Sequence, residues 1–169
     1  MTTQINPDQL LRLIGKRSFA TLATTSPQGR PHVAGVLYDL VDRDLWVSTD
    51  LASRKGRNLA ANGKVAVMIP VRRLPVGPPS SIQFQSTGQL VPLDDPWLGE
   101  LAAAGKLPTV TGHGELERPG GCFVRIGLPD RLLTFGLGMS LFQLLRNPLD
   151  AAGFALLAPR VTGPAVSAA

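Results

Sequence analysis

The sequence has little cysteine and little histidine. Cys122 is the single cysteine among 169 residues, and His32 and His113 are the only histidines. One cysteine excludes an internal disulfide, and the pattern offers no cysteine-rich metal cluster. We therefore expect no metal site, and we expect Cys122 to be a buried apolar side chain.

Long apolar runs are also missing. No run approaches the roughly 18 residues that a membrane span needs, and the N-terminus lacks the basic start and apolar stretch of a signal peptide. A hydrophobic content of 44% with 17% charged residues is ordinary for a globular protein. These features predict one domain over residues 1–158, a frayed tail over 159–169, a cytoplasmic location and no membrane partner.

Aromatic residues are few: two tryptophans, one tyrosine and six phenylalanines. The chain carries a net charge of +5, but without an aromatic stacking motif this charge does not predict nucleic-acid binding. Neither a Ser/His/Asp or Cys/His set nor a pair of carboxylates suggests hydrolysis. The catalytic residues therefore stay unassigned.

Carboxylates are absent from residues 51–93, and the cations in that stretch are Arg54, Lys55, Arg57, Lys64, Arg72 and Arg73. A segment with six cations and no anion is typical of a surface that meets negative charge. A solvated face on a mildly basic protein is the alternative.

Short runs rich in β-forming residues dominate what is present. We predict strands over residues 18–26, 31–40, 45–50, 64–71, 81–93, 122–128 and 131–137. The first two and the last two should form hairpins, and Gly88 should mark a bulge or bend. Helices are predicted over 7–15, 53–61, 96–105 and 139–147, with a mobile connector over 111–121. Many short strands with few helices favour a mainly β fold, a closed or nearly closed barrel.

The helix predicted over residues 53–61 has an unexpected positive charge in its first turns. Ser53 is a good N-cap, but the first turns carry Arg54, Lys55 and Arg57, and a cation near a helix N-terminus costs a few tenths of a kcal/mol. A bound anion would reverse that cost. The hydroxyls of Ser48, Thr49 and Ser53, the free N–H groups and the cations would then form a phosphate site.

Several of these segments together resemble a known family. The hairpin "ATLATTSPQGRPHVAGVLYDL", the strand "LWVSTD", the helix "SRKGRNL" and the strand "KVAVMI" are similar to the FMN-binding split β-barrel group. This group includes pyridoxamine 5′-phosphate oxidase and the flavin/deazaflavin (F-420) oxidoreductases. The resemblance implies an antiparallel, Greek-key-like split β-barrel with a few peripheral helices.

The resemblance also implies a cofactor site. Ser48 and Thr49 match the strand end that touches the cofactor phosphate or ribityl chain, and Arg54 and Lys55 match its phosphate-binding pair. A glutamine that reaches the cofactor in the oxidase branch corresponds to Gln83. The backbone stretch along the flavin ring corresponds to Val33, Ala34, Gly35 and Val36.

The sequence departs from the family pattern in ways that limit the possible activities and cofactors. The C-terminal Arg-x-His-x-Arg pattern of the pyridoxamine oxidase branch is missing, which argues against vitamin B6 oxidation. FMN ends in one phosphate, whereas F-420 adds a phosphodiester-linked lactyl-oligoglutamate tail that Arg57, Lys64, Arg72 and Arg73 would suit. We therefore expect an F-420-dependent reductase acting on a small organic substrate, with FMN as the alternative cofactor and a non-catalytic carrier as the alternative function.

The resemblance further implies a homodimer with cofactor sites at the interface. The expected contact surfaces are the strand "VAVMIPV" and an apolar stripe on the last helix, and Arg72, Arg73 or the 111–121 loop should reach the partner's cofactor. The stripe consists of Met139, Leu141, Leu144 and Leu145.

Overall fold

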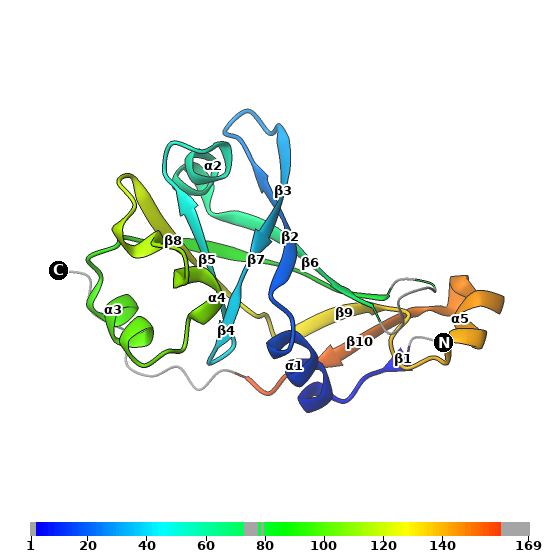
Figure 1. Ribbon diagram of the computed structural model, residues 1–169. Coiled ribbons are helices and arrows are strands. Elements are labelled where there is room, and N and C mark those ends of the chain that lie inside the picture. The colour runs from blue at the N-terminus through cyan, green and yellow to red at the C-terminus, as the bar shows by residue number, and fades with distance from the viewer. Residues whose placement is uncertain (1–2, 73–77, 79, 160–169) are drawn as a thin grey trace.

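A computed structural model of the protein describes residues 3–72, 78 and 80–159. Figure 1 shows a strongly curled sheet with helices at its ends and on one side. The strands are β1 (Thr3–Gln4), β2 (Phe19–Thr25), β3 (Pro31–Leu37), β4 (Asp39–Val41), β5 (Asp44–Asp50), β6 (Lys64–Val71), β7 (Ser80–Val91), β8 (Gly121–Gly127), β9 (Arg131–Phe135) and β10 (Ala152–Leu156). The α-helices are α1 (Pro7–Gly15), α2 (Arg54–Asn62), α3 (Pro96–Ala103), α4 (Pro108–Thr111) and α5 (Leu141–Arg146), and η1 (Glu115–Glu117) and η2 (Pro148–Asp150) are 3-10 turns.

The sheet curls because β7 changes partners along its length; its ladders join it to β6, β8 and β9. Its first part pairs with β6 as far as Thr87, and its last part pairs with β8 from Gly88 onward. The path β3–β2–β6–β7 therefore continues through β8, β5 and β4. Since β4 follows β3 after Tyr38 alone, the path returns to its start. The predicted fold class, a mainly β split barrel, is confirmed.

The predicted bend at Gly88 coincides with this change of partner. A Cβ atom at Gly88 would lie 2.9 Å from Leu59 Cδ2 and 3.1 Å from Val124 Cγ1. The strand therefore passes close to α2 and β8 at this point, where a side chain would not fit without displacement.

Two helices contribute to the barrel core. Leu10 and Ile14 of α1 are fully buried, and the Tyr38 hydroxyl donates a hydrogen bond of 2.8 Å to the Ile14 carbonyl. Burial raises the pKa of Tyr38. From α2, Leu59 joins the same cluster. In Figure 1 these two helices lie at opposite ends of the barrel.

A second core covers the outer side of β4, β5 and β8. Trp46 of β5 is fully buried and packs edge-on against Trp97 of α3, with ring centroids 5.0 Å apart. The carboxylate of Asp39 accepts hydrogen bonds from the backbone N–H groups of Thr109 and Val110 at 2.8 and 3.0 Å, which fixes α4. The members of this cluster are Val41, Trp46, Val91, Leu98, Leu101, Leu107, Val110 and Phe123.

The outer face of the opposite wall carries exposed apolar side chains. Paired residues form one row across the strands, namely Gly35, Thr21, Met68, Gln83, Leu133 and Phe154. The neighbouring inward row, including Leu22, Val67 and Phe84, is buried. On the outer face, by contrast, Val33 is 60% exposed and Leu133 is 48% exposed.

The last third of the chain differs from the sequence prediction. We expected residues 122–128 and 131–137 to form a hairpin, which is wrong: β8 pairs with β5 and β7, whereas β9 pairs with β7 and β10. Strands β1 and β10 were not predicted, because each depends on pairing between distant segments. The expected connector over 111–121 contains the turn η1.

The last helix is shorter than predicted. Helix α5 spans Leu141–Arg146, so Met139 precedes it. Of the expected apolar stripe only Leu144 is buried, against its own chain, while Leu145 is 68% exposed. Within the described residues, no helix reaches the length and apolarity that a membrane crossing requires.

Candidate functional site

The predicted helix start at Ser53 is confirmed, and it lies where β5 ends. The Ser53 hydroxyl accepts a hydrogen bond of 3.0 Å from the Gly56 backbone N–H and lies 3.3 Å from the Thr49 hydroxyl. This N-cap joins the strand end to the helix. Gly63 ends the helix in the left-handed conformation, with φ +63°, which glycine favours at a helix C-terminus.

Gly56 allows α2 to approach β5 closely. A Cβ atom at this position would lie 2.3 Å from the Asp50 carbonyl oxygen and 2.9 Å from Leu51 Cα. These are backbone atoms, which cannot move aside without shifting the strand end. The sequence analysis missed this constraint. From the sequence alone, a glycine within a helix indicates a low helix propensity and does not reveal a close contact with another segment.

A pocket of about 290 Å³ lies between the end of β5, α2 and the segment around η1. Lys55 is partly buried here, and this burial lowers the pKa of its ammonium group. Among the described residues, it has neither a hydrogen-bond acceptor nor an ion-pair partner. We call this the Lys55 pocket; its lining residues are Ser48, Thr49, Asp50, Ser53, Lys55, Glu115 and Arg118.

Two carboxylates enter the Lys55 pocket, which the carboxylate-free stretch 51–93 did not predict. Asp50 accepts a hydrogen bond of 2.7 Å from the Ala52 backbone N–H and lies 4.0 Å from Arg118 Nε. Glu115 accepts a hydrogen bond of 2.7 Å from the His113 backbone N–H. Both carboxylates therefore have partners of their own, and within the described residues neither forms an ion pair with Lys55.

Arg54 does not share this pocket, although the resemblance pairs it with Lys55. Consecutive helical residues point in different directions, whereas residues three and four apart share a face. Arg54, Arg57 and Asn58 accordingly line a second pocket of about 420 Å³, together with Arg30 and His32 from the β2–β3 hairpin. We call this the arginine pocket. The sequence analysis missed Arg30, His32 and Asn58, although the spacing of 54, 57 and 58 was a usable signal.

Strand β3 supplies the backbone stretch that the resemblance aligns with a flavin ring. It is an edge strand of its sheet path, and among the described strands it pairs with β2 only. Val33 and Gly35 are exposed, Ala34 is half-buried and Val36 is buried. The unpaired edge can therefore offer backbone N–H and C=O groups to a planar ligand.

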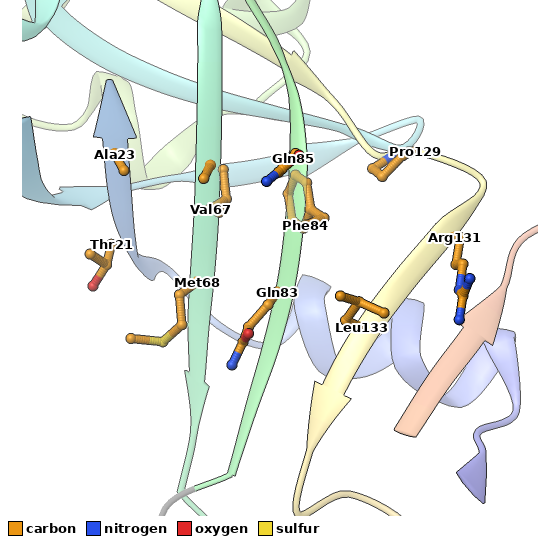
Figure 2. Close-up of a pocket in the computed structure, with 11 residues that line it drawn as sticks. Thr21, Ala23, Val67, Met68, Gln83, Phe84, Gln85, Pro129, Arg131 and Leu133 are labelled. Atoms are coloured by element: carbon orange, nitrogen blue, oxygen red, sulfur yellow. The ribbon is translucent and has the colours of Figure 1, made fainter. Parts of the chain in front are cut away.

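Gln83 lies apart from both pockets near α2. It lines a groove of about 860 Å³ on the exposed outer face of the sheet, and its amide donates a hydrogen bond of 2.9 Å to the Ser81 hydroxyl. Figure 2 shows Thr21, Met68, Gln83 and Leu133 side by side on four strands. The structure therefore brings together some of the predicted site residues and separates Gln83 from them.

The other residues named in the sequence analysis do not line either pocket near α2. Cys122 is buried, as expected, and His113 is exposed next to Glu115. Arg72 accepts a hydrogen bond of 3.3 Å through its carbonyl from Arg17, and Arg73 lies outside the described residues. Within the described ranges, no cluster of three His, Cys, Asp or Glu side chains is suited to hold a metal ion.

Comparison with known families identifies the fold. The family described as pyridoxamine 5′-phosphate oxidase matches residues 7–107, more than half of the chain. The chain belongs to this family. A comparison with curated protein sequences finds no match.

Solved structures of the same fold have diverse descriptions. HutZ, a heme storage protein from Vibrio cholerae, is 20% identical, with 78% of this chain and 94% of that chain covered and a TM-score of 0.61. A FAD-binding protein from Mesorhizobium loti is 18% identical, with 77% and 94% covered and a TM-score of 0.59. A structure described as an F420 reductase is 18% identical, with 69% and 90% covered and a TM-score of 0.50. At these identities the similarity establishes the split-barrel fold alone.

Proposed function

We propose that this protein is an oxidoreductase that uses bound F-420 for hydride transfer to a small organic substrate. The observation that carries the proposal is Lys55, a partly buried cation that forms no ion pair with the described residues and lies beside the hydroxyls of Ser48, Thr49 and Ser53. A desolvated charge is costly unless it is paired. A phosphate or phosphodiester would supply the missing charge and accept hydrogen bonds from the hydroxyls.

The same residues define how the cofactor would be held. Lys55 and the three hydroxyls would bind its phosphate, and the open edge of β3 from Val33 to Val36 would support the ring. When bound, a reduced deazaflavin supplies a hydride. The part of the protein is to orient the ring and leave one face open, which agrees with the lack of an acid–base or nucleophilic set.

FMN is the alternative cofactor, because its single terminal phosphate would satisfy Lys55 equally well. A carrier that binds the cofactor without turnover is the alternative function, since it would share every binding feature. We favour F-420 because additional cations without counter-ions line the neighbouring arginine pocket.

The test begins with protein purified from a deazaflavin-producing host. Mass spectrometry and the absorption spectrum of the released small molecules distinguish F-420, FMN and heme. Oxidation of the reduced cofactor by a panel of small organic acceptors, compared with protein-free controls, then separates an enzyme from a carrier. Release of FMN alone, or of no cofactor together with no binding of added F-420, would overturn the proposal.

A further inference from the structure

The groove on the outer face of the sheet carries positive charge at one end. Its volume of about 860 Å³ lies within the range of small-molecule sites. Among the described residues, Arg131 is the one charged residue that lines it, and no carboxylate does. Arg131 forms no ion pair within the same residues, and the neighbouring Asp130 lies 3.4 Å from Arg43 instead. The groove therefore presents a cation without a carboxylate beside it.

The groove opens where β9 separates from β7. The last pair that joins these two strands is Gln83 with Leu133. Beyond it, β7 pairs with β8 from Gly88 onward, whereas Arg131 of β9 pairs with Leu156 of β10. Because backbone ladders fix the strands on both sides of the opening, a ligand that binds there orders little additional backbone.

The floor of the groove is apolar. Val67 and Phe84 line it and are only 4% and 5% exposed, so they are packed into the barrel core behind it. Gln83 and Gln85 of β7 lie beside them (Figure 2) and are exposed. An amide side chain both donates and accepts hydrogen bonds. This combination suits a largely apolar molecule with a small number of polar groups.

Arg131 is positioned to bind a carboxylate. Its guanidinium carbon lies 5.2 Å from the centre of the Phe154 ring, and this cation–π contact restrains the side chain. A guanidinium group binds a carboxylate through two parallel hydrogen bonds. A single arginine balances the one charge of a carboxylate, whereas a phosphate monoester carries more than one negative charge at neutral pH and would place unpaired charge against the apolar floor.

The other end of the groove lies next to β3, the strand that would support the cofactor ring. Thr21 and Ala23 of β2 line this end, and they pair with Gly35 and Val33 of β3. Neighbouring strands are about 4.8 Å apart. The order β9–β7–β6–β2 therefore places Arg131 about 14 Å from β2. An elongated ligand bound by Arg131 would reach the place proposed for the ring.

We infer that this groove is the substrate site and that the substrate is an elongated, largely apolar carboxylic acid whose carboxylate Arg131 binds. The role as substrate rests on the proposed function, because that function places the ring along β3. Binding of the acid itself does not require the cofactor. Arg131, which the sequence analysis did not mark, is thereby the residue that selects acidic substrates.

The experiment measures the binding of 2-naphthoate and of its neutral analogue 2-naphthamide by isothermal titration calorimetry, without added cofactor. Arg131→Gln should bind 2-naphthoate about three- to tenfold more weakly, because one charge-assisted contact in a solvated groove is lost, and its affinity for 2-naphthamide should not change. The matched control is Arg146→Gln, since Arg146 is an exposed arginine 5.9 Å from the Phe142 ring and outside the groove. Ala66→Phe, which places a ring in the groove, should weaken the binding of both probes.

Three results would overturn the inference. The first is that the parent binds neither probe, and the second is that Arg131→Gln binds 2-naphthoate as tightly as the parent does. The third is a different mass of Arg131→Gln in sedimentation equilibrium, because the groove would then be a contact between two copies of the chain. Thermal melting of each variant without ligand shows whether the fold is retained.

Turnover separates the inference from the proposed function. With reduced F-420, Arg131→Gln should raise the KM of acidic acceptors and leave their kcat and the KM of neutral acceptors unchanged. Equal effects on acidic and neutral acceptors would overturn the assignment of Arg131. If the parent oxidises no reduced F-420 while 2-naphthoate binding still depends on Arg131, the proposed function fails and the acid-binding site stands.

Discussion

At the scale of single residues, the proposed function depends on Lys55, which we expect to bind the cofactor phosphate. Replacement by methionine keeps much of the apolar stem and removes the charge. We expect cofactor affinity to fall by about 1.5–3 kcal/mol, a tenfold loss or more, because a charge-assisted hydrogen bond is lost. The thermal stability of the cofactor-free protein should stay unchanged or rise, since a cation leaves the N-terminus of α2.

Lys16→Met is the control for this variant, because Lys16 is an exposed lysine that follows α1. Fluorescence titration with FMN and with F-420 measures both proteins. Equal affinities of Lys55→Met and the parent would show that the cofactor phosphate lies elsewhere.

The ionisation of Lys55 predicts a pH dependence. Burial lowers the pKa of its ammonium group from the ordinary value of 10.5, so the charge is lost at a lower pH than for an exposed lysine. Cofactor affinity should therefore decrease as the pH rises through this lowered pKa. Lys55→Arg keeps its charge over the whole range and should give a flatter affinity profile in titrations from pH 7 to pH 10.5.

The lowered pKa of Lys55 also makes the free energy of unfolding depend on pH. In the window between the lowered pKa and 10.5, the unfolded chain binds this proton more fully than the folded protein. The contribution of Lys55 to the free energy of unfolding therefore increases with pH across that window and is lost as the pH falls through the folded pKa. Urea unfolding of the cofactor-free parent and of Lys55→Met over this range measures the difference.

At the scale of elements, the position of α2 depends on Gly56. Helix propensity alone predicts that Gly56→Ala stabilises the protein by up to about 1 kcal/mol. The structure predicts the opposite, because the new Cβ atom would lie 2.3 Å from the Asp50 carbonyl oxygen. We expect a loss of about 1–3 kcal/mol, as for other overpacked sites, together with weaker cofactor binding as α2 moves away from β5.

Gly99 provides the matched control on α3. A Cβ atom at Gly99 has no neighbour within 4 Å, so Gly99→Ala should stabilise the protein by about 0.5–1 kcal/mol. Chemical unfolding measures both variants. A stabilising effect of Gly56→Ala would show that α2 does not pack against the end of β5 as described.

At the scale of the whole molecule, the two walls of the barrel differ in what covers their outer faces. Helices α3 and α4 cover the face of β4, β5 and β8, whereas exposed apolar side chains line the face of β2, β3, β6, β7 and β9. They include Phe19, Val33, Leu37, Leu133 and Phe135. Such a patch is typical of a contact surface, and a two-fold dimer would bury it on both chains.

We therefore expect a homodimer through this face, with a mass near twice 17.9 kDa in sedimentation equilibrium at micromolar concentration. Leu133→Asp should shift the equilibrium toward the monomer, because it places a charge within the patch that the dimer would bury. Ala103→Asp, an exposed substitution on α3, is the control and should leave the mass unchanged. A parent protein with a mass near 17.9 kDa would contradict the expectation.

Elements that depend on local chemistry could be predicted from the amino-acid sequence. The caps at Asn6, Ser53 and Asp95 each accept a backbone N–H, as residues of these types commonly do. Runs of β-forming residues located β2, β3, β5, β6, β7 and β8, whereas β4 was predicted as a continuation of β3. The barrel followed from the number of short strands, and the family from the hairpin and the "SRKGRNL" helix. The sequence also placed the hydroxyls of Ser48, Thr49 and Ser53 beside Lys55, because the end of the strand and the start of the helix are adjacent in the chain.

Which distant groups come into contact could be seen in the folded chain alone. Strand β10 pairs with β9 and β1, and no local pattern encodes a partner so far away in the sequence. The 100° turn between consecutive helical residues separated Arg54 from Lys55, and the hairpin then brought Arg30 and His32 to Arg54. Asp50 and Glu115 entered the Lys55 pocket in the same way. Charge composition is a property of the chain, but the charge of a pocket is a sum over segments that folding brings together.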